Sequence, residues 1–327
     1  MATLETQILD EVIVKSRRKM LSLGGSALAG LAVAGLSTPK ANAATLTDAD
    51  ILNFALNLEY LEAQFYNLAV SGVTIDKLSM PVPISVNGGN GGTVTVKPSF
   101  AKVPFVDTAV AAYAAETAME ETKHVLFLQS ALATAAVSMP NIDLYNSFNT
   151  LATVAGIAST FDPFASDATF LIGAYIFEDV GVTAYHGAAP SITDKTTLTK
   201  AVGIHAVEAY HAGLVRLSIN RLDAGSGVLT GYTQKISATR SALANPGGKP
   251  LAVDDYGIAN TTVALQGTSA SYPVTTLVDV DISETSASTS YSQGFARTPQ
   301  QILQIVTGGS SNNQGVFYPN GLNGTIK

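Results

Sequence analysis

Apolar residues recur at helical spacing in four long stretches of the chain, each bounded by capping residues or by a break in the pattern. Gaps of three or four residues between apolar positions are typical of a helix that buries one face. Capping residues begin at Thr47, before the first stretch, and Pro140 follows the end of the second. The four predicted helices cover about residues 47–70, 106–137, 167–188 and 195–223.

Two longer segments interrupt this succession of helices. Residues 72–104 hold two apolar, alternating stretches on either side of a glycine-rich run at 87–92, which predicts a β-hairpin inserted between the first and second helices. Residues 138–167 form a long connection, with a short helix expected near 145–157. Such a crossover is expected when the second and third helices of a bundle run parallel. The pattern therefore predicts an all-α four-helix bundle over residues 45–224.

The end of the chain lacks the dense apolar pattern of the bundle. Residues 225–297 are rich in Ser, Thr, Gly and Ala, and residues 308–327 are rich in Gly and Asn. One alternating stretch at 274–282 predicts a strand, and Thr298-Pro299 is a good start for a short helix to about residue 306. We expect an irregular C-terminal extension that packs on the bundle.

The first 43 residues are typical of an export signal. Arg17 and Arg18 precede a mildly apolar run at 21–36, and Ala-Asn-Ala at 41–43 matches a cleavage pattern. The paired arginines favour the twin-arginine route, with an ordinary secretory signal as the alternative. We therefore expect a periplasmic, extracellular or cell-surface protein. No later apolar run reaches the length of a membrane-spanning helix, so we expect no membrane segment in the mature form.

Charge is scarce, which makes the position of each carboxylate informative. Of the 327 residues, 46% are hydrophobic and 13% are charged, about half the usual charged fraction. The net charge of −7 leaves no basic surface for nucleic acid. The absence of cysteine excludes disulfides and thiolate metal sites. Seven of the ten glutamates fall in the four predicted helices, which indicates a shared role.

The glutamates and histidines of these helices follow a repeated spacing. The first and third helices carry a glutamate followed seven residues later by a tyrosine, whereas the second and fourth carry Glu-x-x-His. The positions are Glu59 and Tyr66, Glu121 and His124, Glu178 and Tyr185, and Glu208 and His211. The chain therefore repeats one pair of helix types, and that is how a four-helix bundle supplies four carboxylates and two imidazoles to two metal ions.

Helix geometry explains why this spacing suits a metal site. Residues three apart lie on one face with side chains about 5–6 Å apart, so each Glu-x-x-His pair can reach one ion. A tyrosine seven residues from a glutamate lies on the same face, about 10 Å along the axis. Four carboxylates offset two divalent cations, and oxygen and imidazole ligands suit iron or manganese. Without metal, some of these glutamates would have to take up protons.

Two glutamates of the first helix compete for one ligand position. Alignment of the two halves places Glu59 over Glu178 and Glu62 over Gly181. The repeat therefore favours Glu59 as the ligand. Glu62, one turn further on, is either a supporting neighbour of the ligands or an alternative ligand.

The remaining candidates have weaker positions. His205 lies one turn before Glu208 and is either a further ligand or, as we prefer, a core histidine bonded inside the bundle. His186 is interpreted as structural, and Glu116 and Glu120 as surface or supporting residues. Tyr66 and Tyr185 are either ordinary core aromatics or catalytic groups that bond a ligand carboxylate or donate electrons close to the metals.

The order Glu, Glu-x-x-His, Glu, Glu-x-x-His resembles the di-iron members of the ferritin-like superfamily. The segments ALNLEYLEAQFY, FEDVGVTAYHGAA and FYPNGLNG are similar to exported bacterial ferritin-like proteins grouped with plant desiccation-related proteins. The resemblance covers about residues 45–222 and, more loosely, the tail. It implies that Glu121 and Glu208 bridge the two metals, with Glu59 and His124 on one ion and Glu178 and His211 on the other.

These observations lead to three functional hypotheses. The first is an oxidoreductase whose two iron or manganese ions react with dioxygen or peroxide, as an oxidase, peroxidase or catalase-like enzyme. The second is a protein that sequesters iron without turnover. The third is a structural stress or desiccation-related protein whose bundle is stabilised by metal or holds none. The predicted insertion and extension argue against a ferritin storage cage, and the sequence does not decide whether the chain forms a homo-oligomer.

Overall fold

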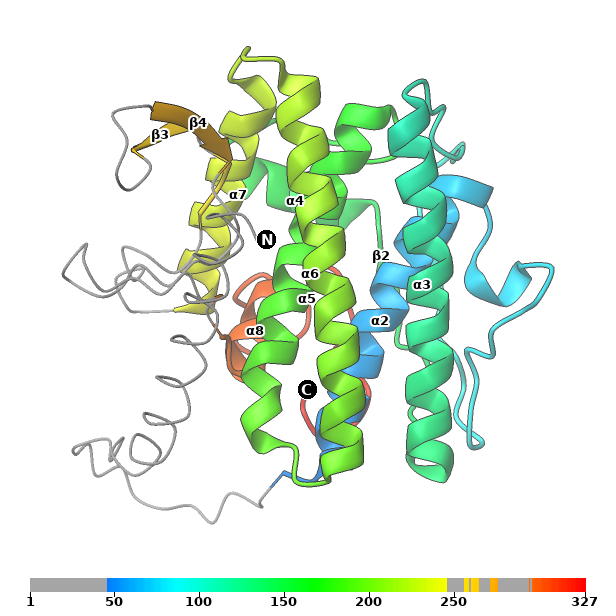
Figure 1. Ribbon diagram of the computed structural model, residues 1–327. Coiled ribbons are helices and arrows are strands. Elements are labelled where there is room, and N and C mark those ends of the chain that lie inside the picture. Colours follow the sequence, from blue (N-terminus) through cyan, green and yellow to red (C-terminus); the bar gives the residue numbers. More distant parts are fainter. Residues whose placement is uncertain (1–45, 246–255, 259, 265–270, 276–293, 295) are drawn as a thin grey trace, which may run out of the picture. The chain divides into compact units, whose positions relative to one another are not determined.

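The computed structural model describes residues 46–245, 256–258, 260–264, 271–275, 294 and 296–327. The predicted signal peptide at 1–43 lies outside the described residues. Four long helices dominate the described part (Figure 1). They are α2 (Asp48–Ser71), α3 (Thr108–Leu132), α5 (Asp167–Ala188) and α6 (Lys195–Asp223). The predicted all-α bundle is confirmed, and each long helix lies where the apolar pattern placed it.

Side-chain caps fix where these helices begin. Thr47 and Asp50 form a reciprocal capping box on α2, and Ser166 does the same with Thr169 on α5. Asp107 and Asp194 accept hydrogen bonds from the first turns of α3 and α6. Within the described residues, no helix combines the length and apolar character needed to cross a membrane.

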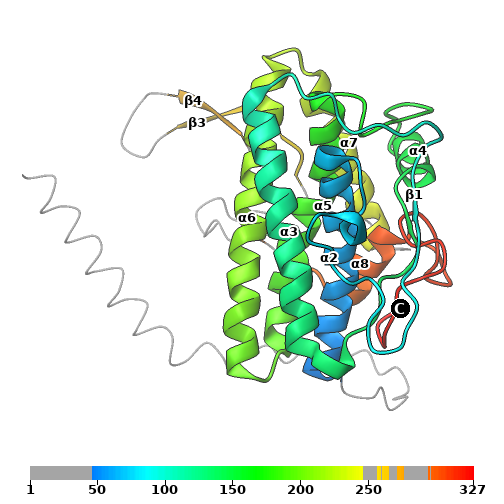
Figure 2. The ribbon, with the colours of Figure 1, turned by 90° about the vertical axis from the view of Figure 1, so that its right-hand side faces the viewer.

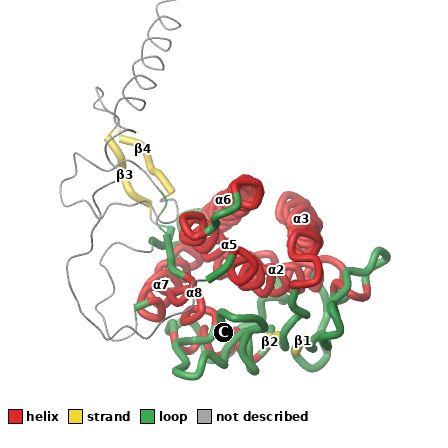
Figure 3. Tube along the Cα trace, turned by 90° about the horizontal axis from the view of Figure 1, so that it is seen from below, coloured by secondary structure: helices red, strands yellow, loops and turns green. Residues whose placement is uncertain are grey.

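Two aspartates show how the helices are directed. Asp167, at the start of α5, accepts hydrogen bonds from the backbone of Val106 and Asp107, just before α3. Asp48, at the start of α2, accepts bonds from Thr193 and Asp194, just before α6. Helices α3 and α5 therefore begin at one end and α2 and α6 at the other, so the predicted parallel second and third helices are confirmed. Figure 2 shows the four helices side by side, and Figure 3 shows them nearly end-on.

The predicted hairpin at 72–104 is wrong. Its one strand, β1 (Val94–Thr95), pairs in parallel with β2 (Ile142–Asp143) from the crossover. The other half of the segment also bonds the crossover, because the Met139 N–H donates to the Ile84 carbonyl over 2.9 Å. The crossover therefore lies between the two stretches that were expected to pair, and it takes up their backbone hydrogen bonds.

A glycine in this segment is required by the close approach of two backbones. The Gly92 N–H donates to the Met139 carbonyl over 2.7 Å. A Cβ atom on Gly92 would lie 2.3 Å from the carbonyl carbon of Pro140. The glycine-rich run thus serves contact with the crossover, where the sequence had indicated a hairpin turn.

The shorter elements surround this bundle. The crossover holds α4 (Asn146–Val154), as predicted, and the chain after α6 holds α7 (Val228–Ala244), the antiparallel pair β3 (Asn260–Ala264) and β4 (Ser271–Thr275), and α8 (Pro299–Val306). Three 3₁₀ turns cover Ile75–Lys77, Ala133–Ala135 and Ala189–Ser191. Of the strand predicted at 274–282, β4 includes the first two residues, and the rest lies outside the described residues.

Helix α7 was not predicted because its inward face is polar. Thr233, Ser237 and Arg240 on that face are all buried. Arg240 and Arg216 both bond the buried carboxylate of Asp179, at 2.7 and 2.9 Å. Both guanidinium groups also lie over the Tyr175 ring, within 5.0 Å of its centroid. A charged network therefore holds α7 against α5 and α6, where an apolar stripe would normally do so.

The C-terminal tail closes over α2. The Tyr318 hydroxyl donates to the Asn57 carbonyl over 2.8 Å, and the Asn57 side chain bonds the backbone of Asn323 in both directions. Phe317 packs edge-on against Phe177 and against Phe148 of α4. These contacts explain why α2 is buried almost all round.

We predict that Asp179→Ala lowers the free energy of unfolding by about 3 kcal/mol or more, because two buried guanidinium groups lose their shared carboxylate. Asp76→Ala removes a carboxylate whose ion pair with Lys77 is exposed, and should cost less than about 1 kcal/mol. Urea denaturation of both variants measures the difference. Equal losses in the two variants would contradict a stabilising role for the buried network.

Candidate metal centre

The six residues predicted as metal ligands lie together inside the bundle. Each of the four long helices contributes to the cluster, and every member is more than nine-tenths buried. The members are Glu59 on α2, Glu121 and His124 on α3, Glu178 on α5, and Glu208 and His211 on α6. Their function as ligands remains a prediction, and the structure brings all six side chains together, as the spacing predicts.

One group of potential ligands centres on His124. Its Nδ1 atom lies 3.2 Å from Glu59 Oε2, 3.3 Å from Glu121 Oε2 and 3.6 Å from Glu208 Oε1. One ligand atom from each of these four residues lies within 4.8 Å of the others. Three carboxylate oxygens and one imidazole nitrogen therefore face a common point.

A second group centres on His211. Its Nδ1 atom lies 3.0 Å from Glu121 Oε1 and 3.4 Å from Glu178 Oε2. Glu121 belongs to both groups, since its Oε1 faces His211 and its Oε2 faces His124. The two imidazole rings are 6.4 Å apart between centroids. A carboxylate divided in this way has the arrangement of a bridge between two ions.

The chemistry of the donor atoms fits metal ions. Several buried atoms of the cluster have no hydrogen-bond partner, namely both carboxylate oxygens of Glu121, both of Glu208, Oε2 of Glu178 and Nδ1 of His211. Buried polar atoms are normally paired, because an unsatisfied one costs about 1–3 kcal/mol and more if it is charged. Carboxylate oxygens and imidazole nitrogens that face one another without hydrogen bonds are the expected ligand atoms of a carboxylate-rich metal site.

Protonation is strongly perturbed in the cluster. Burial raises the pKa of Glu59 to about 7, although the His124 charge opposes it. Burial alone would lower the pKa of His124, but the charges of Glu59 and Glu121 outweigh burial and raise it to about 12. For His211 burial again lowers the pKa, and the charge of Glu178 with its neighbours raises it overall. Without cations, therefore, the carboxylates are balanced by protons and imidazolium charge.

A fifth carboxylate, Glu62, is buried beside the six. Burial and the charges of neighbouring glutamates raise the pKa of Glu62 well above its usual value. The structure groups Glu59 with His124, and Glu62 belongs to neither group of potential ligands. Its counterpart in the repeat, Gly181, makes room for another glutamate, since a Cβ atom there would lie 2.1 Å from Glu208 Oε2. Glu62 and Gly181 are thus where the two halves of the repeat differ.

The two tyrosines cross between the halves of the repeat. The Tyr66 hydroxyl donates to Oε1 of Glu178, and the Tyr185 hydroxyl donates to Oε1 of Glu59. Burial and the nearby carboxylates raise the pKa of both phenols well above 10, so both remain protonated donors. Each tyrosine therefore orients a glutamate from the other half of the repeat. Tyr66 on α2 orients Glu178 on α5, and Tyr185 on α5 orients Glu59 on α2.

The remaining candidates lie around the cluster. Nε2 of His211 lies 2.7 Å from Glu120 Oε2, so Glu120 orients the imidazole. Glu116 accepts a bond from the Tyr210 hydroxyl and belongs to neither group. The rings of His205 and His186 are 5.9 Å apart, and neither residue belongs to a ligand group. Burial, with the neighbouring His186, lowers the pKa of His205.

Sequence comparison places this architecture in a family. Residues 47–221 match the family model of the ferritin-like domain, and the chain belongs to that family. Over 216 residues it is 31% identical to the desiccation-related protein PCC13-62 of Craterostigma plantagineum. This alignment covers 63% of this chain and 65% of that protein. Over 304 residues it is 24% identical to the ferritin-like catalase Nec2 of Nesocodon mauritianus, covering 90% of this chain and 89% of the relative. No solved structure matches the chain significantly.

We predict that the metal-free protein loses stability between about pH 5 and pH 8. The raised pKa of Glu59 gives stability that is complete below the unfolded value of 4.5 and is lost as the pH rises through about 7. The raised pKa values of His124 and His211 act in the same direction above 6.5. The melting temperature of chelator-treated protein should fall by about 5 °C or more across this range. A melting temperature that rises with pH would contradict the assignment of protons to the cluster.

Proposed function

We propose that the protein binds two iron or manganese ions in this cluster and uses them for redox chemistry with peroxide or dioxygen. The breakdown of hydrogen peroxide to water and dioxygen is the reaction we place first. The observation that carries the proposal is the position of Glu121, whose two buried, unpartnered oxygens face two separate groups of ligands. A carboxylate divided in this way suits a bridge between two ions.

The proposed assignment gives each residue a function. Glu59, His124 and Glu208 hold the first ion, Glu178 and His211 hold the second, and Glu121 bridges them. Glu208 also extends toward the second ion if it bridges, as the family resemblance implies. The raised pKa of Glu62 favours its protonated form, so the four ligand carboxylates would cancel the charge of two divalent ions and leave the occupied site neutral.

The protein residues control how such a centre reacts. Bound iron or manganese would supply the reversible transfer of electrons to or from peroxide or dioxygen. Tyr66 and Tyr185 hold one oxygen of Glu178 and Glu59, which leaves the other oxygen of each carboxylate for a metal. Glu120 fixes the orientation of the His211 ring through its outer nitrogen. Burial of the whole set excludes bulk water, which strengthens the electrostatic interactions among these side chains.

The similarity to a ferritin-like catalase over most of both chains supports peroxide breakdown. The similarity to a desiccation-related protein supports the second candidate, a stress protein that sequesters iron or is stabilised by metal without turnover. Metal analysis of protein purified from its native host, followed by measurement of dioxygen released from hydrogen peroxide, separates the two. About two ions per chain with dioxygen release supports the catalase proposal. Two ions without turnover would favour the second candidate, and metal-free protein with intact helices would exclude both metal functions.

The bridging residue provides the sharpest test of the ligand set. We expect Glu121→Ala to lose at least one of about two ions per chain, because both ligand groups lose an oxygen. Glu116→Ala, on the same helix but in neither group, should keep both. Elemental analysis of the two purified variants measures the metal content. Full metal content in Glu121→Ala would show that the ligands are wrongly assigned.

The two tyrosines should affect turnover more than metal content. We expect Tyr66→Phe and Tyr185→Phe to retain both ions and to lower the rate of peroxide breakdown roughly tenfold, since each loses a bond to a ligand carboxylate. Tyr60→Phe is the matched control, because that buried hydroxyl bonds the Val137 carbonyl and Gln129. Initial rates at saturating peroxide measure the effect. Equal rates in all three variants would show that Tyr66 and Tyr185 act only as packed core side chains.

A further inference from the structure

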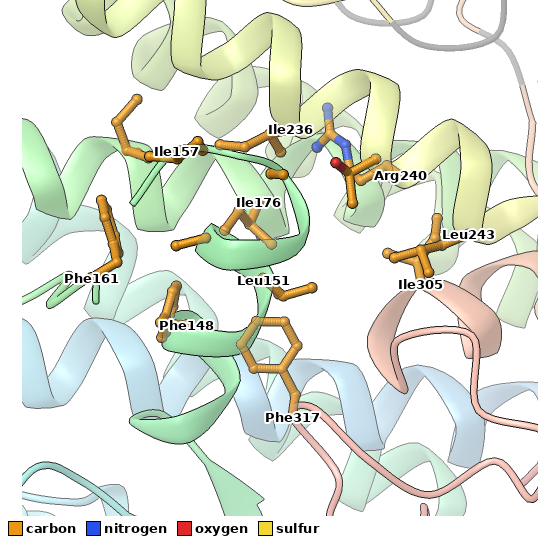
Figure 4. Close-up of a pocket in the computed structure, with 14 residues that line it drawn as sticks. Phe148, Leu151, Ile157, Phe161, Ile176, Ile236, Arg240, Leu243, Ile305 and Phe317 are labelled. Atoms are coloured by element: carbon orange, nitrogen blue, oxygen red, sulfur yellow. The ribbon is translucent and has the colours of Figure 1, made fainter. Parts of the chain in front are cut away.

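A cavity of about 30 Å³ lies where the C-terminal extension meets the bundle. Figure 4 shows its walls: Ile176 from α5, Phe148 from α4, Ile236 from α7, Ile305 from α8 and Phe317 from the tail. The residues at its rim on α4, α7 and the chain between α4 and α5 are only half-buried, whereas those at its base are buried. This outer cavity is therefore open toward solvent at one side and closed by apolar side chains at the other.

A second cavity of about 20 Å³ lies deeper, against the metal centre. All of its lining residues are buried, and Glu62 and Gly181 are among them. Gly181 directly adjoins the carboxylate of Glu208. This inner cavity therefore reaches the side of the cluster where the repeat is broken and the glycine leaves room.

The two cavities share one wall. Ile176, Ile305 and Phe317 line both, so these three side chains stand between them. Rotation of side chains of this size between rotamers takes place without movement of the backbone. The cavities thus form an interrupted apolar path from the surface to the Glu62 side of the metal centre.

We propose that this path conducts dioxygen between solvent and the metal centre. The side chains of Ile305, Ile176 and Phe317 form its gate. The proposal rests on the proposed function. Dioxygen is small and apolar, and each cavity exceeds the 10–15 Å³ or so that one water molecule needs. Peroxide and water would lose their hydrogen bonds along the path, because its polar side chains are confined to Thr239 and Arg240 in the outer cavity and Glu62 in the inner one.

Polar molecules have a different approach. On the α3 and α6 side, Glu120 is partly exposed and bonds His211, and His124 retains slight exposure. A small cavity of about 10 Å³ there is lined mainly by apolar side chains and does not make this approach polar. The partly exposed carboxylate of Glu120 and the His211 ring can hydrogen-bond peroxide or water on this side, so we expect peroxide to approach the centre from here.

The C-terminal extension supplies part of this path. Helices α7 and α8 and the tail supply much of the outer cavity and two of the three gate residues. The charged network around Asp179 and the bonds of Tyr318 to α2 hold these elements in place. The extension therefore builds an apolar entrance on a bundle whose own four helices supply the ligands.

Xenon, an apolar probe of similar size, tests the path without any metal chemistry. Crystals of the protein pressurised with xenon should show it in both the outer and the inner cavity. Ile305→Phe should lose the inner xenon, and Ile305→Ala should raise its occupancy. An inner cavity that stays empty in the wild-type protein while the outer one fills would overturn the proposal.

Oxidation of bound Fe(II) provides the second readout. Ile305→Phe should slow oxidation by dioxygen by about threefold or more and leave anaerobic oxidation by peroxide unchanged. The control Ile51→Phe adds the same aromatic volume beside a separate cavity lined by Tyr185 and should change neither rate. Equal slowing of both reactions in Ile305→Phe would also overturn the path. If wild-type protein oxidises no iron with either oxidant, the iron form of the proposed function fails, and xenon alone decides whether the path exists.

Discussion

The burial of five carboxylates at one point inside a helical bundle is the constraint on which the rest of the structure depends. A buried charge costs several kcal/mol unless it is paired, protonated or bound to a cation. Two imidazoles, two phenolic donors and raised carboxyl pKa values supply part of that compensation. The capped helices, the tail bonded to α2 and the network that holds α7 fix in place the elements that bury this point.

The periodicity of apolar residues was enough to predict the bundle, because its helices bury broad faces and begin at clear caps. The Glu-x-x-His spacing brought the six side chains together, since residues three apart share a helix face whatever surrounds them. The repeat carried one finer distinction. It favours Glu59 over Glu62 as the ligand, and the structure groups Glu59 with His124.

Features that depend on distant partners could not be predicted. The apolar stretches at 82–86 and 93–96 have the sequence pattern of a hairpin, and nothing local shows that both bond the crossover instead. Helix α7 buries Arg240 and Ser237 on its inward face. Such polar residues are typical of an exposed surface, and their burial depends on the contact of Arg240 with Asp179. Glu62 was ambiguous for the same reason, because its burial depends on the tail and α8. In each case a tertiary contact outweighed the local pattern.

The crossed tyrosine–glutamate bonds have a consequence for how the protein assembles. They join residues 112 and 126 positions apart in the chain, and each connects the first helix pair to the second. Contacts of such long range close late in folding, because the loop entropy must be overcome first. Neither helix pair can therefore complete its own half of the centre. The centre is therefore complete only when the crossover has brought the two helix pairs together.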